Sequence, residues 1–255
     1  MSGILALFYR EMKIWVRRPL VPFLSLMQPL LYLLIFGPVL GRMMPPVKVG
    51  EVYVEYSVFI LPGILTIFIL NTCIMSSLIS LFLDRRTGMI EFLMACPVSK
   101  SAYLLARFIA SIIQVILQTT FLLLLSHVIL RFPLSLIGIL TFFTGVVLGT
   151  IFFLSVTMII ATKITDQDIF NALISFFVPI LIFTSTAFYP IDLFPDLLAA
   201  VARINPLVYI VDFLRAGLLN TFTDTTILTT LFFKIITLLT RIVSIILFSR
   251  QKALS

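Results

Sequence analysis

The sequence has little charge, few cysteines and a single histidine. Only 11% of its 255 residues are charged and 61% are hydrophobic, whereas a soluble domain carries roughly 25% charged and 45–50% apolar residues. Cys73 and Cys96 are too few for a disulfide scaffold, and the scattered basic residues do not resemble a nucleic-acid-binding surface. A water-soluble fold could not bury this much apolar surface. The composition therefore indicates a membrane protein.

The sequence also lacks the groups that catalysis would need. No Gly-Lys pair occurs, so the Gly-rich phosphate loop of an ATPase is absent. There is no constellation of nucleophile, acid and base, and His127 is better explained by packing and hydrogen bonding than by metal ligation. We expect no catalytic residue, no metal ligand and no cofactor bound by this chain.

Six apolar runs are long enough to cross a bilayer. A hydrocarbon core of ~30 Å requires about 20 helical residues, and the alternating pattern of barrel strands is missing. We predict an all-α membrane protein whose residues 1–255 form one transmembrane domain. Its six expected spans are residues 20–41, 57–83, 103–130, 134–162, 169–188 and 226–249.

The distribution of Lys and Arg predicts the orientation. Six spans place both termini on one side, and that side, with the loops after the second and fourth spans, carries 11 of the 18 Lys and Arg residues. The opposite side carries 5. Because short cytoplasmic loops are enriched in these residues, we expect both termini to be cytoplasmic, in a plasma or inner membrane.

Residues 1–19 mix apolar and basic side chains ahead of the first span. This pattern, with Trp15 as an interfacial anchor, predicts an amphipathic helix lying in the inner headgroup layer. The alternative is a basic flank that only orients the first span.

The cytoplasmic loop at residues 84–99 is too polar to span a membrane, yet it contains an apolar stretch. A helix over 88–95, ended by Pro97, would present apolar side chains around Glu91. Such a helix could dock into a groove on another protein, or it could pack against the ends of the chain's own helices. The pattern alone does not choose between these two interpretations.

We predict two short apolar helices in the outer segment, residues 189–220. Pro195 and Asp196 favour a helix start, and Asn205 with Pro206 favours a stop. Both helices are too short to cross the membrane, so we expect a re-entrant hairpin in the outer leaflet before the last span.

Together these features resemble the permease subunits of type-2 ABC transporters, the exporter family that includes drug-efflux and polysaccharide-export permeases. The resemblance covers almost the whole chain and rests on the N-terminal amphipathic helix, the six spans, the cytoplasmic loop and the outer motif. The matching residues are Arg86, Gly88, Glu91, Phe92, Leu93 and Pro97-Val98-Ser99 in the loop, and Phe188-Tyr189-Pro190, Asn205-Pro206-Leu207, Asp212 and Arg215 in the outer motif.

The resemblance implies that residues 86–95 form a coupling helix that docks on a cytoplasmic ATPase, with Glu91 as its polar contact. It implies two permease chains, identical or sister chains, with two ATPase subunits that bind ATP and Mg. The transported substrate would be a drug, a lipid or a lipid-linked glycan. The implied docking residues are Arg86, Gly88, Met89, Glu91, Phe92, Leu93 and Pro97.

A polar stripe follows one face of the third span. Arg107, Ser111, Gln114 and Gln118 recur at intervals of three and four residues. The stripe could line a transport path together with Asn71 and Asn171 from the second and fifth spans, or it could make interhelical hydrogen bonds.

One feature does not follow from the resemblance. Lys234 and Arg241 lie inside the sixth run on roughly one helical face, where they could face a polar interior or reach toward opposite interfaces.

The alternative to a permease subunit is a self-contained secondary transporter or channel. Such a protein would normally show inverted repeats, or ionisable residues at mid-membrane coupled to an ion, and we see neither clearly.

Overall fold

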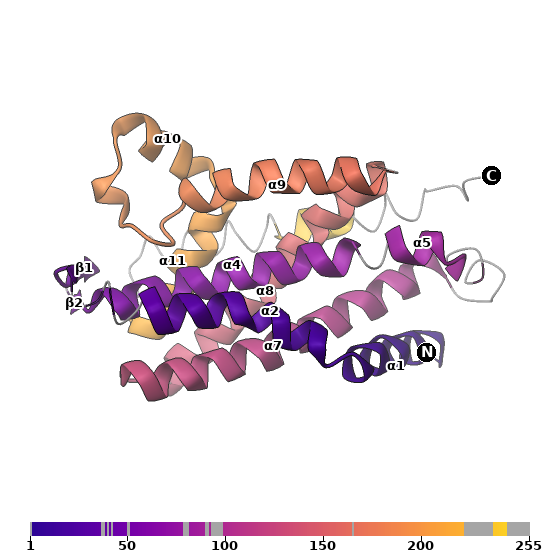
Figure 1. Cartoon of the computed structure of the whole chain (residues 1–255), viewed down its shortest axis with the longest axis horizontal. Helices are drawn as coiled ribbons and strands as arrows, with labels where there is room; N and C mark the ends of the chain where they lie inside the picture. The colour runs from indigo at the N-terminus through magenta and orange to yellow at the C-terminus, as the bar shows by residue number, and fades with distance from the viewer. Residues whose placement is uncertain are drawn as a thin grey trace.

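The computed structural model is mostly helical, and its helices run along the long axis of the molecule (Figure 1). It describes residues 2–36, 39, 41, 43–49, 52–78, 82–89, 92, 99–164, 166–221 and 237–243. The longer helices are α1 (Ser2–Arg17), α2 (Leu20–Leu31), α4 (Tyr56–Leu78), α7 (Lys100–Leu130), α8 (Leu136–Lys163), α9 (Gln167–Phe183) and α11 (Pro206–Leu219). The shorter elements are η1 (Tyr32–Phe36), β1 (Val47–Val49), β2 (Val52–Val54), α5 (Asp84–Arg86), η3 (Ile191–Leu193) and α10 (Asp196–Ile204).

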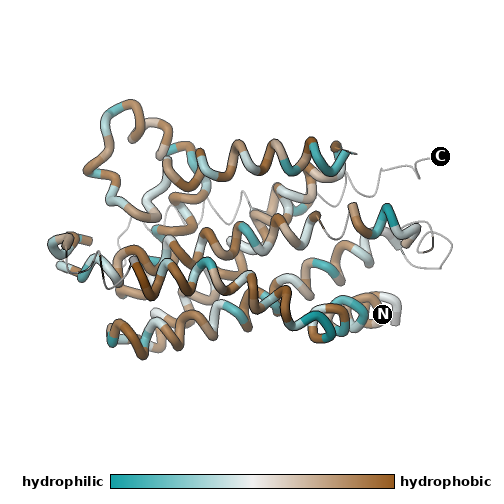
Figure 2. Tube along the Cα trace, in the orientation of Figure 1, coloured by the Kyte–Doolittle hydropathy of each residue, from teal (hydrophilic) through white to brown (hydrophobic). Residues whose placement is uncertain are grey.

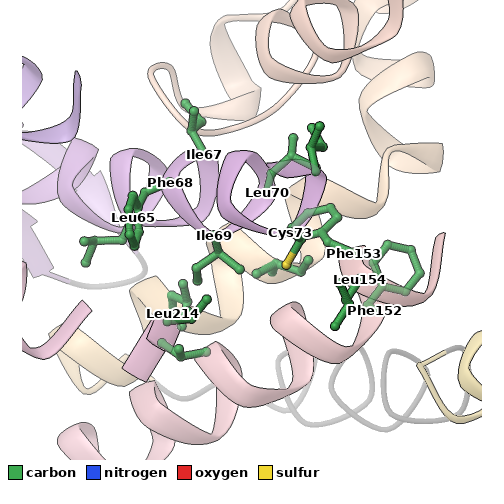
Figure 3. Close-up of a cluster of buried hydrophobic side chains, with 14 of the residues drawn as sticks. Leu65, Ile67, Phe68, Ile69, Leu70, Cys73, Phe152, Phe153, Leu154 and Leu214 are labelled. Carbon is green, nitrogen blue, oxygen red and sulfur yellow. The ribbon is translucent and has the colours of Figure 1, made fainter. Parts of the chain in front are cut away.

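Helix α4 forms the centre of the core. Nearly all of its residues are buried, and it packs against α7, α8 and α11. Figure 3 shows Ile69 and Cys73 of α4 beside Leu154 of α8 and Leu214 of α11, and all four side chains have no exposed surface. A helix that is apolar on every side is stable only when protein or lipid surrounds it.

One close approach fixes α4 against the outer segment. A Cβ atom on Gly63 would lie 2.3 Å from the carbonyl oxygen of Ala187. Only glycine allows the two backbones to come this close. The Tyr56 hydroxyl donates a hydrogen bond of 2.9 Å to the Phe188 carbonyl and holds the same segment about two helical turns away from Gly63.

Local sequence signals account for where the other helices begin and end. Ser99 and Ser135 cap α7 and α8 through their hydroxyl groups, and Asp166 caps α9 through its carboxylate. Pro19 follows the end of α1, and the axis turns by 70° into α2. Pro29 inside α2 precedes the π-helical turn η1, as expected where a proline removes a backbone donor.

One end of the molecule combines hydrophilic segments of three helices. Figure 2 shows hydrophilic stretches in α1, in α5 and at the start of α9, all at the same end. The β hairpin and α10 lie at the opposite end (Figure 1). This arrangement matches the alternation of loops that the span pattern predicts.

The described residues give fewer complete spans than the six in the prediction. Helices α4, α7 and α8 are each long and apolar enough to cross a membrane, and counting the bent pairs α1–α2 and α10–α11 gives up to five. Helix α9 is apolar but has only 17 residues. Of the sixth run, 226–249, only residues 237–243 are described, so that span stays a prediction.

The chain is mostly helical, in agreement with the all-α prediction, and a short β hairpin is the one element that was not predicted. Strands β1 and β2 pair antiparallel between α2 and α4, with Val47 opposite Val54 and Val49 opposite Val52. Valine favours strands because its branched side chain fits a pleated surface. A strand of three residues is too short for its alternation to be noticed beside the apolar spans.

Candidate functional site

The polar stripe of α7 faces a cavity inside the chain. Ser111 and Gln118 are buried, and with Gln114 they line a cavity of about 800 Å³ between α1, α2, α4 and α7, which we call the polar cavity. Asn71 of α4 also lines it. Asn171, by contrast, is exposed on α9 and is not among the lining residues. Arg107 lines the cavity too, so the structure brings together five of the six residues that the sequence analysis offered as path-lining.

Several stripe residues also make interhelical hydrogen bonds. The hydroxyls of Ser76 and Ser111 lie 2.7 Å apart and join α4 to α7. The Gln118 amide donates to the Pro22 carbonyl at 3.2 Å and to the Ser25 hydroxyl at 3.0 Å, which joins α7 to α2. These bonds fit the interhelical interpretation of the stripe.

Other polar atoms in the cavity have no such partner. Gln114 makes no hydrogen bond to any residue that the structure describes. Within the same described ranges, Thr72 Oγ1 and Arg107 Nε are buried without a hydrogen-bond acceptor or donor. The stripe therefore supports helix packing at some positions and leaves polar groups available at others.

Buried ion pairs close one end of the polar cavity. Glu11 of α1 pairs with Arg107 of α7, and both side chains are more than 90% buried. Arg10 donates to Asp84 of α5 at 3.0 Å and to Glu11 at 3.0 Å. The Tyr103 hydroxyl donates to the other Asp84 oxygen at 2.7 Å. We call these five residues the charge cluster.

The charge cluster links three segments that are far apart in sequence. It joins the N-terminal helix, the start of the loop after α4, and the first turns of α7, and Arg107 also donates to the Ser76 carbonyl of α4 at 2.8 Å. Partial burial lowers the pKa of Arg10, but the hydrogen bond to Asp84 and the charges of Asp84 and Glu11 outweigh it, so the pKa lies above its usual value. Arg10 therefore stays charged.

The sequence analysis missed this cluster. It counted Arg10 and Arg107 among the basic residues that set orientation, and it assigned no role to Glu11 or Asp84. The available signal was an acid in each of two otherwise basic segments, since a buried arginine needs an acidic partner.

The loop expected to dock on an ATPase is described only in part. Asp84–Arg86 form α5, Gly88 has a positive φ of 67°, and Arg86 and Gly88 are exposed. Met89 is half-buried, and Phe92 is 62% exposed. Glu91, Leu93 and Pro97 lie outside the described residues.

The outer motif forms hydrogen bonds between elements. Asn205 caps α11 by accepting from the Leu207 N–H at 2.9 Å, and its amide donates to the Leu181 carbonyl of α9 at 2.7 Å. Pro206 is the first residue of α11, as suits a proline. Pro190 lies just before η3.

Arg215 anchors α11 to the core. It pairs with Asp212 at 2.8 Å, donates to the Thr186 carbonyl at 2.6 Å and lies over the Phe59 ring, 4.0 Å from its centroid. These contacts hold α11 against α4 and the end of α9. The outer motif is thus a set of packing and hydrogen-bonding residues in this chain.

The other residues that the sequence analysis discussed are His127, Lys234 and Arg241. The His127 ring packs edge-on against Phe132, with 5.6 Å between centroids. No group of three or more metal-ligating side chains occurs in the portion of the chain that was searched. Arg241 is half-buried, whereas Lys234 lies outside the described residues, so the relation of the two stays a prediction.

Comparison with known proteins identifies relatives over most of the chain. The family model described as ABC-2 type transporter matches residues 2–219. The protein named "Putative transport permease ycf38" of Cyanophora paradoxa is 28% identical over 206 residues, covering 78% of this chain and 68% of the relative. The protein of the same name in Porphyra purpurea is 27% identical over 211 residues, covering 82% of this chain and 71% of the relative.

Proposed function

The chain belongs to the ABC-2 type transporter family, and on that premise we propose that it is the permease subunit of an ATP-binding-cassette exporter. Chains of this family are multi-pass membrane subunits that work with an ATPase partner and are not ATPases themselves. In the proposed complex two permease chains, identical or sister chains, pair above two ATPase subunits. Hydrolysis of ATP with Mg in those subunits moves a hydrophobic or amphipathic substrate out of the cytoplasm.

The observation that carries the proposal is the charge cluster at the polar end of the molecule. It ties the start of the 84–99 loop to both α1 and α7 through Asp84. A docked ATPase that moves this loop would therefore move the end of α7, on which the polar stripe lies. Buried ion pairs are suited to such a link, because breaking one leaves a charge without a partner.

The ATPase contact can be tested with substitutions in the 84–99 loop and in the β hairpin at the other end of the molecule. We expect the tagged full-length chain, purified from its native membrane in mild detergent, to bring down a protein with ATPase motifs. Phe92→Asp and Glu91→Arg should each abolish the association. The first places a charge in an apolar contact, and the second reverses the charge of the polar contact. Tyr53→Asp is the matched control, since Tyr53 is 71% exposed on the β hairpin at the other end. An ATPase absent from the wild-type preparation would favour the self-contained transporter or channel.

The role of the polar stripe can be tested by comparing two glutamines. Gln118→Leu removes two interhelical hydrogen bonds and should lower the thermal stability, since each such bond contributes about 0.6–2 kcal/mol. Gln114→Leu removes no hydrogen bond to a described residue and should leave the stability unchanged. We expect Gln114→Leu to reduce ATP-driven export in reconstituted vesicles. Normal export by this variant would exclude a path-lining role for Gln114.

A further inference from the structure

The polar cavity has an apolar body and a basic entrance. Its volume of about 800 Å³ lies within the roughly 300–1,000 Å³ of small-molecule sites. Ile64, Ile67 and Phe68 of α4 and Leu24 of α2 line the body. Because these residues belong to apolar helices of membrane-spanning character, the body of the cavity suits an acyl chain.

Four arginines and two acids line the cavity, which leaves an excess of two positive charges. Arg10 and Arg107 are engaged by Glu11 and Asp84 in the charge cluster. The excess therefore lies on Arg17 and Arg18, which are exposed and have no acidic partner among the described residues. An anionic group is the natural complement to this pair.

The basic pair lies where the chain turns from α1 into α2. The two helix axes differ by 70°, and Trp15 lines the cavity one turn before the arginines. Tryptophan and arginine side chains of an amphipathic helix concentrate at the headgroup level of a membrane. If α2 starts the first span, the arginines meet lipid headgroups while the cavity body lies at acyl-chain depth.

A polar group without a partner lies deeper in the cavity. Gln114 is two helical turns beyond Arg107, about 10 Å along α7. Its side chain lines the cavity, is half-buried, and makes no hydrogen bond to a described residue. The Gln114 amide can therefore donate a hydrogen bond to an ester carbonyl below a headgroup.

We propose that the polar cavity binds an anionic glycerophospholipid from the cytoplasmic leaflet. The phosphate lies against Arg17 and Arg18, an ester carbonyl accepts from Gln114, and an acyl chain fills the apolar body between α2 and α4. A second copy of this chain is a poor occupant, because it would bring the same basic end to a basic entrance. The inference goes beyond the proposed function, since the lipid binds in the absence of any ATPase.

The single tryptophan makes the proposal directly measurable. Trp15 is the only tryptophan of the chain and lines the cavity, so a brominated acyl chain that enters should quench its fluorescence. We expect saturable quenching when the purified full-length chain in mild detergent is titrated with phosphatidylglycerol brominated on its acyl chains. Equally brominated phosphatidylcholine should quench only at higher concentrations.

Substitutions separate the basic entrance from the cavity body. Arg17→Gln with Arg18→Gln should weaken the apparent affinity for phosphatidylglycerol roughly thirtyfold, as expected for two arginines that each act on an anionic lipid. The matched control is Arg131→Gln with Arg203→Gln, which removes two exposed arginines elsewhere and should change nothing. Gln114→Leu should weaken binding severalfold while keeping the charge. Circular dichroism and size-exclusion chromatography establish that each variant is folded.

Three results would overturn the proposal. Equal quenching by the two brominated lipids, or unchanged affinity in the Arg17 and Arg18 double variant, would mean that the entrance does not recognise an anionic headgroup. Complete competition by millimolar glycerol phosphate would mean that the arginines bind a free phosphate group and that the acyl chain contributes nothing. Because the assay contains no ATPase, these results leave the exporter proposal untouched.

Discussion

At the scale of single residues, the charge cluster shows how a membrane protein keeps charges buried. Glu11, Asp84 and Arg107 are each less than 10% exposed, and every one of them has an oppositely charged partner. An isolated charge in such surroundings would cost several kcal/mol. The cluster is therefore stable only as a unit, and removing one member should harm the rest.

We expect Glu11→Ala to destabilise the chain by about 3–5 kcal/mol, because it leaves Arg107 buried without its partner. Thermal unfolding in detergent, followed by Trp15 fluorescence, measures the change. The double variant Glu11→Ala with Arg107→Ala should lose less stability than the sum of the losses in the two single variants, because each single variant already removes the same ion pair. Glu55→Ala, an exposed acid at the other end, should alter stability by no more than about 0.5 kcal/mol. Additive effects in the double variant would contradict a direct Glu11–Arg107 interaction.

At the scale of helices, local signals predicted much of what the structure contains. The amphipathic pattern predicted α1, Pro195-Asp196 predicted where α10 begins, and Asn205-Pro206 predicted where it ends. These signals are caps, prolines and apolar runs, which act over one or two turns. The sequence analysis could not pair Glu11 with Arg107 or Arg10 with Asp84, because such contacts depend on how distant helices pack.

The contact between α4 and the outer segment gives a prediction at this scale. We expect Gly63→Ala to destabilise the chain strongly, because its Cβ would meet backbone atoms of Ala187 that cannot move aside. Gly149→Ala is the matched control on α8, where the nearest atom is Cγ2 of the Ile210 side chain at 3.2 Å, which can adjust. Thermal unfolding of the two variants should place Gly63→Ala well below Gly149→Ala. Equal melting temperatures would mean that α4 and the outer segment are not held this closely in the folded protein.

At the scale of the whole molecule, the fold separates two chemically different ends. The charge cluster and α5 lie at one end, and the β hairpin and the outer motif lie at the other. The exposed Phe92 belongs to the first end, because its backbone N–H donates to the carbonyl of Gly88, two residues after α5. The basic residues predict that the first of these ends faces the cytoplasm. The same orientation underlies ATPase docking and lipid entry, so it can be tested before either.

Cysteine labelling measures this orientation. We start from Cys96→Ser and retain Cys73, which is fully buried and should not react. A membrane-impermeant maleimide should label Tyr53→Cys in intact cells and Phe92→Cys only after the membrane is opened, because the two exposed positions lie at opposite ends. The unsubstituted Cys96→Ser chain, which should stay unlabelled under both conditions, is the control. Labelling of Phe92→Cys in intact cells would show that the orientation is the opposite of the predicted one, and the 84–99 loop could then not meet a cytoplasmic ATPase.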